Sequence, residues 1–112
     1  MRIIWILFLT TIFAWGNMGQ LLYEGNCYTC HGIEKADSAP SAKAIQDRYK
    51  QTFATKKAFI DFMRTWIQTP NATTALMPEE IARYGIMPTL GYDDFTLNEI
   101  GEYMYEMEFD SE

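Results

Sequence analysis

Apolar side chains recur at helical spacing in the middle of the chain. They stand at positions i, i+3, i+4, i+7 and i+8 of one segment: Phe59, Phe62, Met63, Trp66 and Ile67. Residues at this spacing share one face of an α-helix. Thr55 precedes the stripe as a candidate N-cap, and Pro70 follows it, where the proline ring prevents the helix from continuing. The pattern predicts a helix that begins after Thr55 and buries one face.

Three shorter segments have weaker helical patterns, roughly 18–26, 41–49 and 79–84. In the first of them Leu21 and Leu22 are apolar. Two acidic residues follow Pro78 and suit the first turn of the third segment. Gly85 is placed to end that helix.

The sequence Thr96-Leu97-Asn98-Glu99 has the form of a capping box and predicts the start of the last helix at Thr96. The apolar face of this helix comprises Ile100, Tyr103, Met104 and Met107. The chain contains no convincing run of alternating strand residues. We therefore expect an all-α fold of four or five short helices joined by long loops.

The first residues differ in character from the rest. Arg2 precedes an apolar run over 3–15, which is shorter than the roughly 20 residues that span a membrane comfortably. Ala14-Trp15-Gly16 offers small residues for cleavage after Gly16. The sequence predicts a signal peptide over 1–16 and an exported, periplasmic domain over 17–112. An uncleaved anchor that holds the domain at the membrane is the alternative, and a buried N-terminal helix is disfavoured because the run has no polar face.

Composition narrows the class of protein. The 112 residues suit one domain, and 48% of them are hydrophobic, which is too many for a disordered chain. The net charge is -6 and no basic run is present, so nucleic acid is excluded as a partner. An acidic protein suits a partner that has a basic docking patch.

Cys27-x-x-Cys30-His31 is the sequence of c-type haem attachment. Thiols at this spacing can bond the two vinyl groups on one porphyrin edge, and the next residue is then placed under the iron. Three alternatives are a disulfide, a thioredoxin-like redox pair and a zinc site. No βαβ pattern supports the redox pair, and two cysteines and one histidine are too few for a zinc site without carboxylates.

His31 is the only histidine, so a second imidazole ligand from this chain is excluded. A methionine thioether is the soft ligand that favours reduced iron. Met77 and Met87 are each followed by proline, which keeps the chain out of a helix and lets the thioether point from a loop. Three other methionines lie on helix stripes, where core packing is the better interpretation: Met63, Met104 and Met107.

Two stretches resemble the small class I cytochromes c. Gly19-x-x-Leu22-Tyr23-x-x-x-Cys27-x-x-Cys30-His31-Gly32 is similar to that family's opening motif. Met87-Pro88-x-Leu90 and Leu97-x-x-Ile100-x-x-Tyr103-Met104 are similar to its closing motif. The resemblance implies short helices wrapped around one covalent haem c. It also implies that the N- and C-terminal helices cross, with Gly19 and Tyr103 at the crossing.

The resemblance also implies a set of site residues. Met87 has the family's spacing to the last helix and is the expected sixth ligand, with Met77 as the alternative. Pro40 resembles the proline whose carbonyl accepts a hydrogen bond from the haem-ligating histidine. Arg48, Tyr49 and Trp66 are candidates to bind the haem propionates, although core packing or solvation explains each of them equally well.

The expected function is one-electron transfer between redox proteins, in the respiratory chain or elsewhere, without enzymatic activity. A haem subunit fixed in a larger oxidoreductase complex uses the same chemistry and is the first alternative. A haem enzyme or gas-binding protein with an open iron position is disfavoured, because no distal histidine is available. The membrane is expected as a partner only if segment 1–16 is retained.

Overall fold

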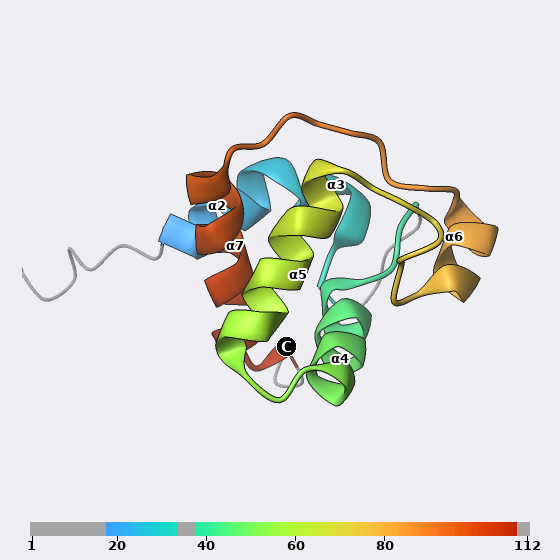
Figure 1. Cartoon of the computed structure of the whole chain (residues 1–112). Helices are drawn as coiled ribbons and strands as arrows, with labels where there is room; N and C mark the ends of the chain where they lie inside the picture. The colour runs from blue at the N-terminus through green and yellow to red at the C-terminus, as the bar shows by residue number, and fades with distance from the viewer. Residues whose placement is uncertain (1–17, 34–37, 110–112) are drawn as a thin grey trace, which may run out of the picture.

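The computed structural model describes residues 18–33 and 38–109, so the predicted signal peptide lies outside the described residues. Six helices occur in these ranges: α2 (Met18–Asn26), α3 (Tyr28–His31), α4 (Ala42–Thr52), α5 (Lys56–Gln68), α6 (Pro78–Tyr84) and α7 (Asp94–Glu106). The same ranges contain no strand, which confirms the all-α prediction (Figure 1). Within them, no helix combines the length and apolar character needed to cross a bilayer.

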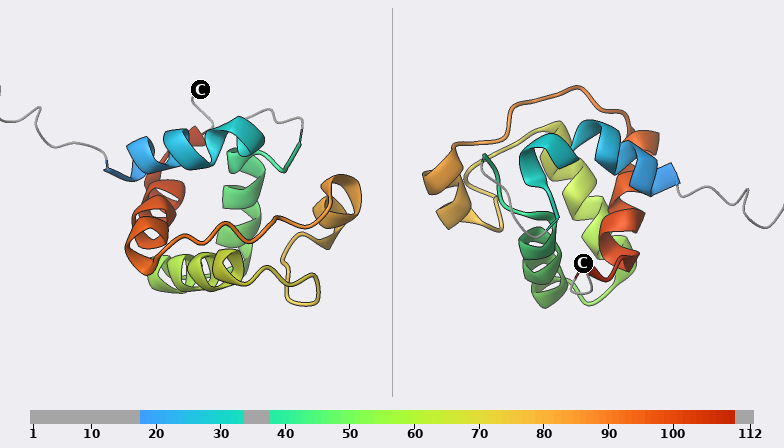
Figure 2. Two further views of the ribbon diagram at one scale, coloured as in Figure 1. Left: turned by 90° about the horizontal axis from the view of Figure 1, so that it is seen from above. Right: turned by 180° about the vertical axis from the view of Figure 1, so that it is seen from behind.

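Four groups of helices form a frame when the molecule is seen from above. The sides are α2 with α3, then α4, α5 and α7 (Figure 2). The C-terminal helix α7 packs against α2, α4 and α5. Segment 85–93 runs over the top of this frame and connects α7 to α6, which lies outside the frame, beyond α4 (Figures 1 and 2).

The crossing of α2 and α7 depends on Gly19. A Cβ atom at this position would overlap the carbonyl oxygen of Glu99 and would lie 2.7 Å from Cβ of Tyr103. The rings of Tyr23 and Tyr103 pack one turn further along, with centroids 5.5 Å apart. The expected crossing of the terminal helices at Gly19 and Tyr103 is confirmed. The apolar side chain of Leu21 is 65% exposed, because Gly19 and Tyr23 form the buried face of α2.

The core is rich in aromatic side chains. The largest fully buried side chains are Phe59, Leu97, Ile100 and Phe109. Among the described residues Gln46 is the buried polar exception: its side-chain amide donates to the carbonyls of Met104 and Met107, at 2.8 and 2.5 Å. These two carbonyls belong to the C-terminal end of α7, where backbone acceptors lack partners within the helix. Gln46 thus ties α4 to the last turn of α7.

Helix boundaries follow the predicted signals in the middle of the chain. The Thr55 hydroxyl caps α5 by accepting from the Ala58 amide at 3.1 Å, and Gly85 ends α6 with a φ of 89°. The start predicted for α7 is wrong. Asp93 is the N-cap and accepts from the Thr96 amide at 2.8 Å, so α7 begins at Asp94. Hydrogen bonds from Thr96 also lower the pKa of the Asp93 carboxyl.

The helix count exceeds the predicted four or five because the cysteine motif itself forms one helical turn, α3. The His31 amide donates to the Cys27 carbonyl at 3.0 Å, and the Gly32 amide donates to Tyr28 at 2.8 Å. Gly32 has a φ of 58° and ends this turn. A four-residue turn leaves no apolar period, so sequence pattern could not reveal it.

We predict that Gly19→Ala destabilises the holoprotein by about 1–3 kcal/mol, because the added methyl forces α2 away from the α7 backbone. Gly25→Ala is the matched control in the same helix, since a Cβ there meets no atom within 4 Å. That change should leave stability unchanged or raise it by up to about 1 kcal/mol. Thermal unfolding followed by circular dichroism measures both. Equal effects of the two changes would contradict the close crossing.

Candidate functional site

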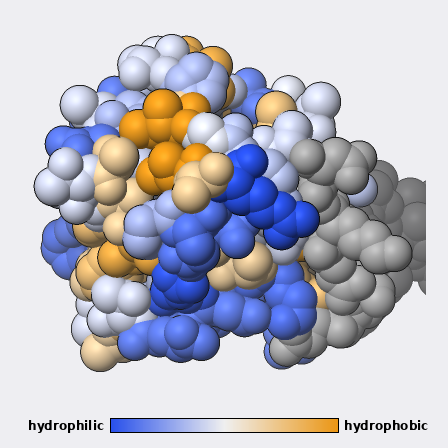
Figure 3. Space-filling view, turned by 90° about the vertical axis from the view of Figure 1, so that its right-hand side faces the viewer, coloured by the Kyte–Doolittle hydropathy of each residue, from blue (hydrophilic) through white to orange (hydrophobic). Residues whose placement is uncertain are grey.

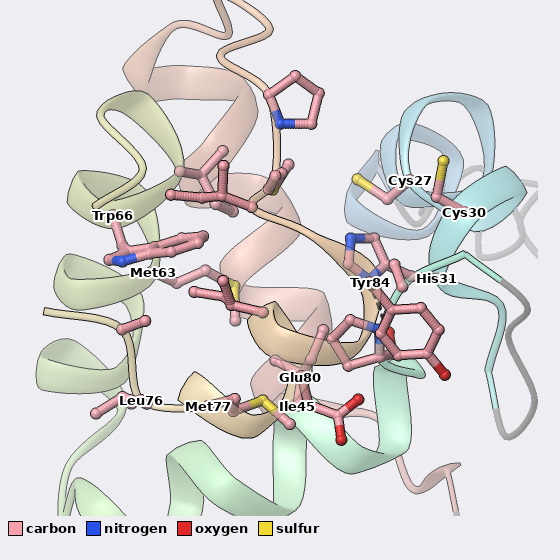
Figure 4. A pocket seen from close by; sticks show the side chains of 18 of the residues that line it. Cys27, Cys30, His31, Ile45, Met63, Trp66, Leu76, Met77, Glu80 and Tyr84 are labelled. Carbon is pink, nitrogen blue, oxygen red and sulfur yellow. Dashed lines mark hydrogen bonds between the residues drawn. The ribbon is translucent and has the colours of Figure 1, made fainter. Parts of the chain in front are cut away.

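A cavity of about 330 Å³ lies inside the frame and is lined by side chains from all six helices. Apolar residues dominate its wall, including Ile45, Met63, Ile67, Leu76, Ile81 and Ile100. In Figure 4 the two cysteines and His31 lie at one end, and Trp66, Leu76 and Met77 lie at the other. The cavity therefore combines an apolar interior with a few sulfur and nitrogen donors, as cofactor sites commonly do.

The short helix α3 brings the three residues of the cysteine motif to one wall. Cys27 is its N-cap, and Cys30 and His31 occupy its last two positions. All three side chains line the cavity (Figure 4). A ligand in the cavity can thus contact both thiols and the imidazole at once.

A backbone carbonyl fixes the ring of His31. Its Nδ1 atom lies 2.7 Å from the carbonyl oxygen of Pro40. A carbonyl can only accept, so Nδ1 carries the proton and Nε2 retains its lone pair. Burial lowers the pKa of His31, although the Pro40 hydrogen bond opposes this effect, so the neutral ring is favoured. A neutral imidazole with one oriented free nitrogen is suited to binding a metal.

Tyr23 secures the turn that follows His31. Its hydroxyl donates to the carbonyl of Gly32 at 2.5 Å, and burial raises the pKa of this tyrosine. The side chain is only 2% exposed. Because Tyr23 also packs on Tyr103, the hydrogen bond connects the α2–α7 crossing directly to the histidine end of the cavity.

The thiols do not have the character of a redox-active pair. Cys27 and Cys30 are not bonded to each other. Burial, together with the neighbouring Cys30, raises the pKa of Cys27 to about 11. Redox-active cysteines have a lowered thiol pKa, so this environment disfavours the thioredoxin-like alternative. Across 18–33 and 38–109, no cluster of three or more His, Cys, Asp or Glu side chains is arranged to hold a metal ion such as zinc.

Four methionines line the cavity: Met63, Met77, Met87 and Met104. Met63 and Met104 belong to the buried core cluster, at 4% and 2% exposure, as expected for packing residues. Met77 and Met87 lie in the segments on either side of α6 and are partly exposed. The structure thus brings both proline-flanked methionines to the same cavity as His31.

Two of the candidates for propionate binding are engaged elsewhere. Arg48 donates to the Leu76 carbonyl and to the Glu79 carboxylate, and Trp66 Nε1 donates to the Asn71 carbonyl at 3.0 Å. Tyr49 is 6% exposed and lines the cavity. The hydrogen-bonding groups of Arg48 and Trp66 are therefore bonded to other atoms of the protein, which disfavours the propionate-binding role considered for them.

Glu80 is a charged residue on the cavity wall that the sequence did not identify as part of the site. Glu80 lines the cavity together with Tyr84, four residues later in α6 (Figure 4). The i, i+4 spacing places both on one face of the helix. The i, i+4 spacing of Glu80 and Tyr84 is the sequence signal for a shared face. The pattern of acidic residues after Pro78 indicates only a favourable first helical turn, and it does not distinguish Glu80 from Glu79.

The family model for cytochrome c matches residues 17–104, and the chain belongs to this family. Searches of curated proteins and of solved structures found no match. The family binds haem c covalently, and a single small domain fits one haem. The cavity fits that group, because two thiols, an oriented imidazole and thioethers meet in an apolar space. The protein is thus a haem-based electron carrier.

Proposed function

We propose that this protein is an exported carrier of single electrons, with one haem attached at Cys27 and Cys30. His31 and Met87 are its axial iron ligands, and Met77 is the alternative to Met87. The convergence of both thiols and the oriented His31 on one apolar cavity is the observation that carries the proposal. Haem supplies the electron-transfer chemistry, because its iron alternates between the ferrous and ferric states.

The residues of the chain set the conditions for this transfer. The Pro40 carbonyl holds the His31 ring in one orientation. The apolar wall limits access of water, and a methionine thioether stabilises reduced iron and raises the reduction potential. Met87 is preferred over Met77 because it has the family's spacing to the last helix.

The proposed partners are redox proteins with a basic docking patch. The net charge of -6 supports this choice, since opposite charge accelerates encounter. Ile86 and Leu90 line the cavity and are 46% and 50% exposed, so apolar surface reaches solvent at its edge. The face on the side of α6 is mixed: orange, apolar side chains gather mainly in its upper part, and blue, hydrophilic side chains lie in its middle and lower part (Figure 3).

Export to the periplasm is the proposed location. Arg2, the apolar run over 3–15 and Gly16 support a signal peptide or an anchor. The position of the cysteine motif shortly after this segment supports the same location, because c-type haem is attached to exported chains.

We predict that the holoprotein shows a six-coordinate, low-spin haem in both redox states and does not bind carbon monoxide readily when reduced. Methionine ligation leaves no open iron position, which distinguishes a carrier from a gas-binding protein or haem enzyme. Absorption spectra of the reduced protein with and without carbon monoxide test this. Rapid and complete formation of a carbon monoxide complex would favour the open-site alternative.

We predict that Met87→Ala removes the thioether ligand, opens the iron to added ligands and lowers the reduction potential. Met77→Ala is the matched control, because this methionine also precedes proline and lines the same cavity. It should leave the spectrum almost unchanged. The weak far-red band of methionine-ligated ferric haem, together with potentiometry, provides the measurement. Loss of this band in Met77→Ala and its retention in Met87→Ala would reverse the assignment.

A further inference from the structure

The helix α6 is held differently from the other parts of the cavity wall. The main helix–helix packing in the described residues joins α2 with α3 and α7, and α7 with α4 and α5, and α6 takes no part in it. Helix α6 lies outside the frame, beyond the side that α4 forms (Figure 2, left). Its seven residues include none that is fully buried. The position of α6 therefore depends on contacts made by individual side chains.

Arg48 makes two such contacts from α4. Nη1 of its guanidinium donates to the Leu76 carbonyl at 2.5 Å, and Nη2 donates to the carboxylate of Glu79. One acceptor precedes Met77 and the other follows Pro78, so the two bonds bracket the turn that enters α6. The rigid fork of a guanidinium fixes both acceptors relative to each other and to α4.

The bracketed turn carries part of the cavity wall. Leu76 and Met77 line the cavity directly, and Glu80, Ile81 and Tyr84 follow on the inward face of α6 (Figure 4). A movement of this turn away from α4 would carry these side chains with it. It would open the cavity along the wall that Leu76, Met77 and the inward side chains of α6 form.

We infer that Arg48 is a positioning residue for the haem pocket: by holding the Leu76–Glu79 turn against α4 it keeps α6 closed over the cavity. This inference rests on the proposed haem site. It adds a latch, formed by the hydrogen bonds of Arg48 to Leu76 and Glu79, that controls access to this site. The latch acts through local opening of α6, a segment with little packing of its own, and leaves the α2–α7 core unaffected.

The expected effect follows from the two contacts. The Arg48 side chain is 37% exposed and that of Glu79 is 51% exposed, so the ion pair between them contributes little by itself. The charged hydrogen bond to the Leu76 carbonyl contributes more, because it is partly buried, whereas the pair with Glu79 is exposed. Loss of both should raise the population of the open form about tenfold.

The test is the rate at which imidazole binds to the ferric holoprotein. Arg48→Gln should bind imidazole about tenfold faster than the wild type, and Arg48→Lys, which can restore only one contact, should be intermediate. Lys57→Gln is the control: it removes the same charge from an exposed pair with Asp61 in α5, which lies away from the latch. It should change the rate less than twofold. An unchanged rate in Arg48→Gln would overturn the inference.

Amide hydrogen exchange separates the latch from general destabilisation. In Arg48→Gln the amides of Ile81–Tyr84 should exchange about tenfold faster, while those in the middle of α5 should be unchanged. Equal acceleration in both helices would show a purely structural role and would also overturn the inference. This measurement does not use the haem spectrum, so failure of the haem proposal and failure of the latch give different results.

Discussion

The close approach of α2 to α7 at Gly19 is the constraint on which the rest of the structure depends. It fixes the direction of α2, and therefore the place where Cys27 begins the short helix α3. Tyr23 extends this constraint to the turn after His31, because its ring packs on Tyr103 and its hydroxyl donates to the Gly32 carbonyl. A backbone contact at one end of α2 is thus linked to the orientation of the cysteine motif at the other.

At the end of the cavity that holds the cysteine motif, the surroundings of His31 and Cys27 favour one protonation state of each side chain. The Pro40 carbonyl leaves His31 with one tautomer, and burial favours its neutral form. Burial also keeps Cys27 protonated, which disfavours thiolate redox chemistry. The same apolar surroundings suit a porphyrin, which provides the large apolar body that a domain of this size needs for its core.

Much of this arrangement could be predicted from the sequence, since it depends on local signals. The Thr55 cap, the stripe from Phe59 to Ile67 and the glycine end of α6 need only neighbours in the chain. The family motifs further gave the crossing at Gly19. The approach of Pro40 to His31 was likewise expected from them, and the structure places these two residues in hydrogen-bond contact.

The parts that could not be predicted depend on competition between nearby residues for one position, or on contacts between residues far apart in the sequence. Asp93 and Thr96 both can cap a helix, and the structure selects the earlier one. Leu21 is apolar but exposed, because the small residue Gly19 takes the buried face of α2. The bonds from Arg48 to Leu76 and Glu79 join residues about 30 positions apart and leave no periodic signal.

Mass spectrometry of the protein matured with haem tests the central claim most directly. The intact chain should carry the mass of one haem, and digestion should place it on the single peptide that contains Cys27 and Cys30. Replacing both cysteines with alanine should abolish the added mass. A chain that gains no haem, or whose Cys27–Cys30 peptide is recovered as a simple disulfide, would contradict this account of the site.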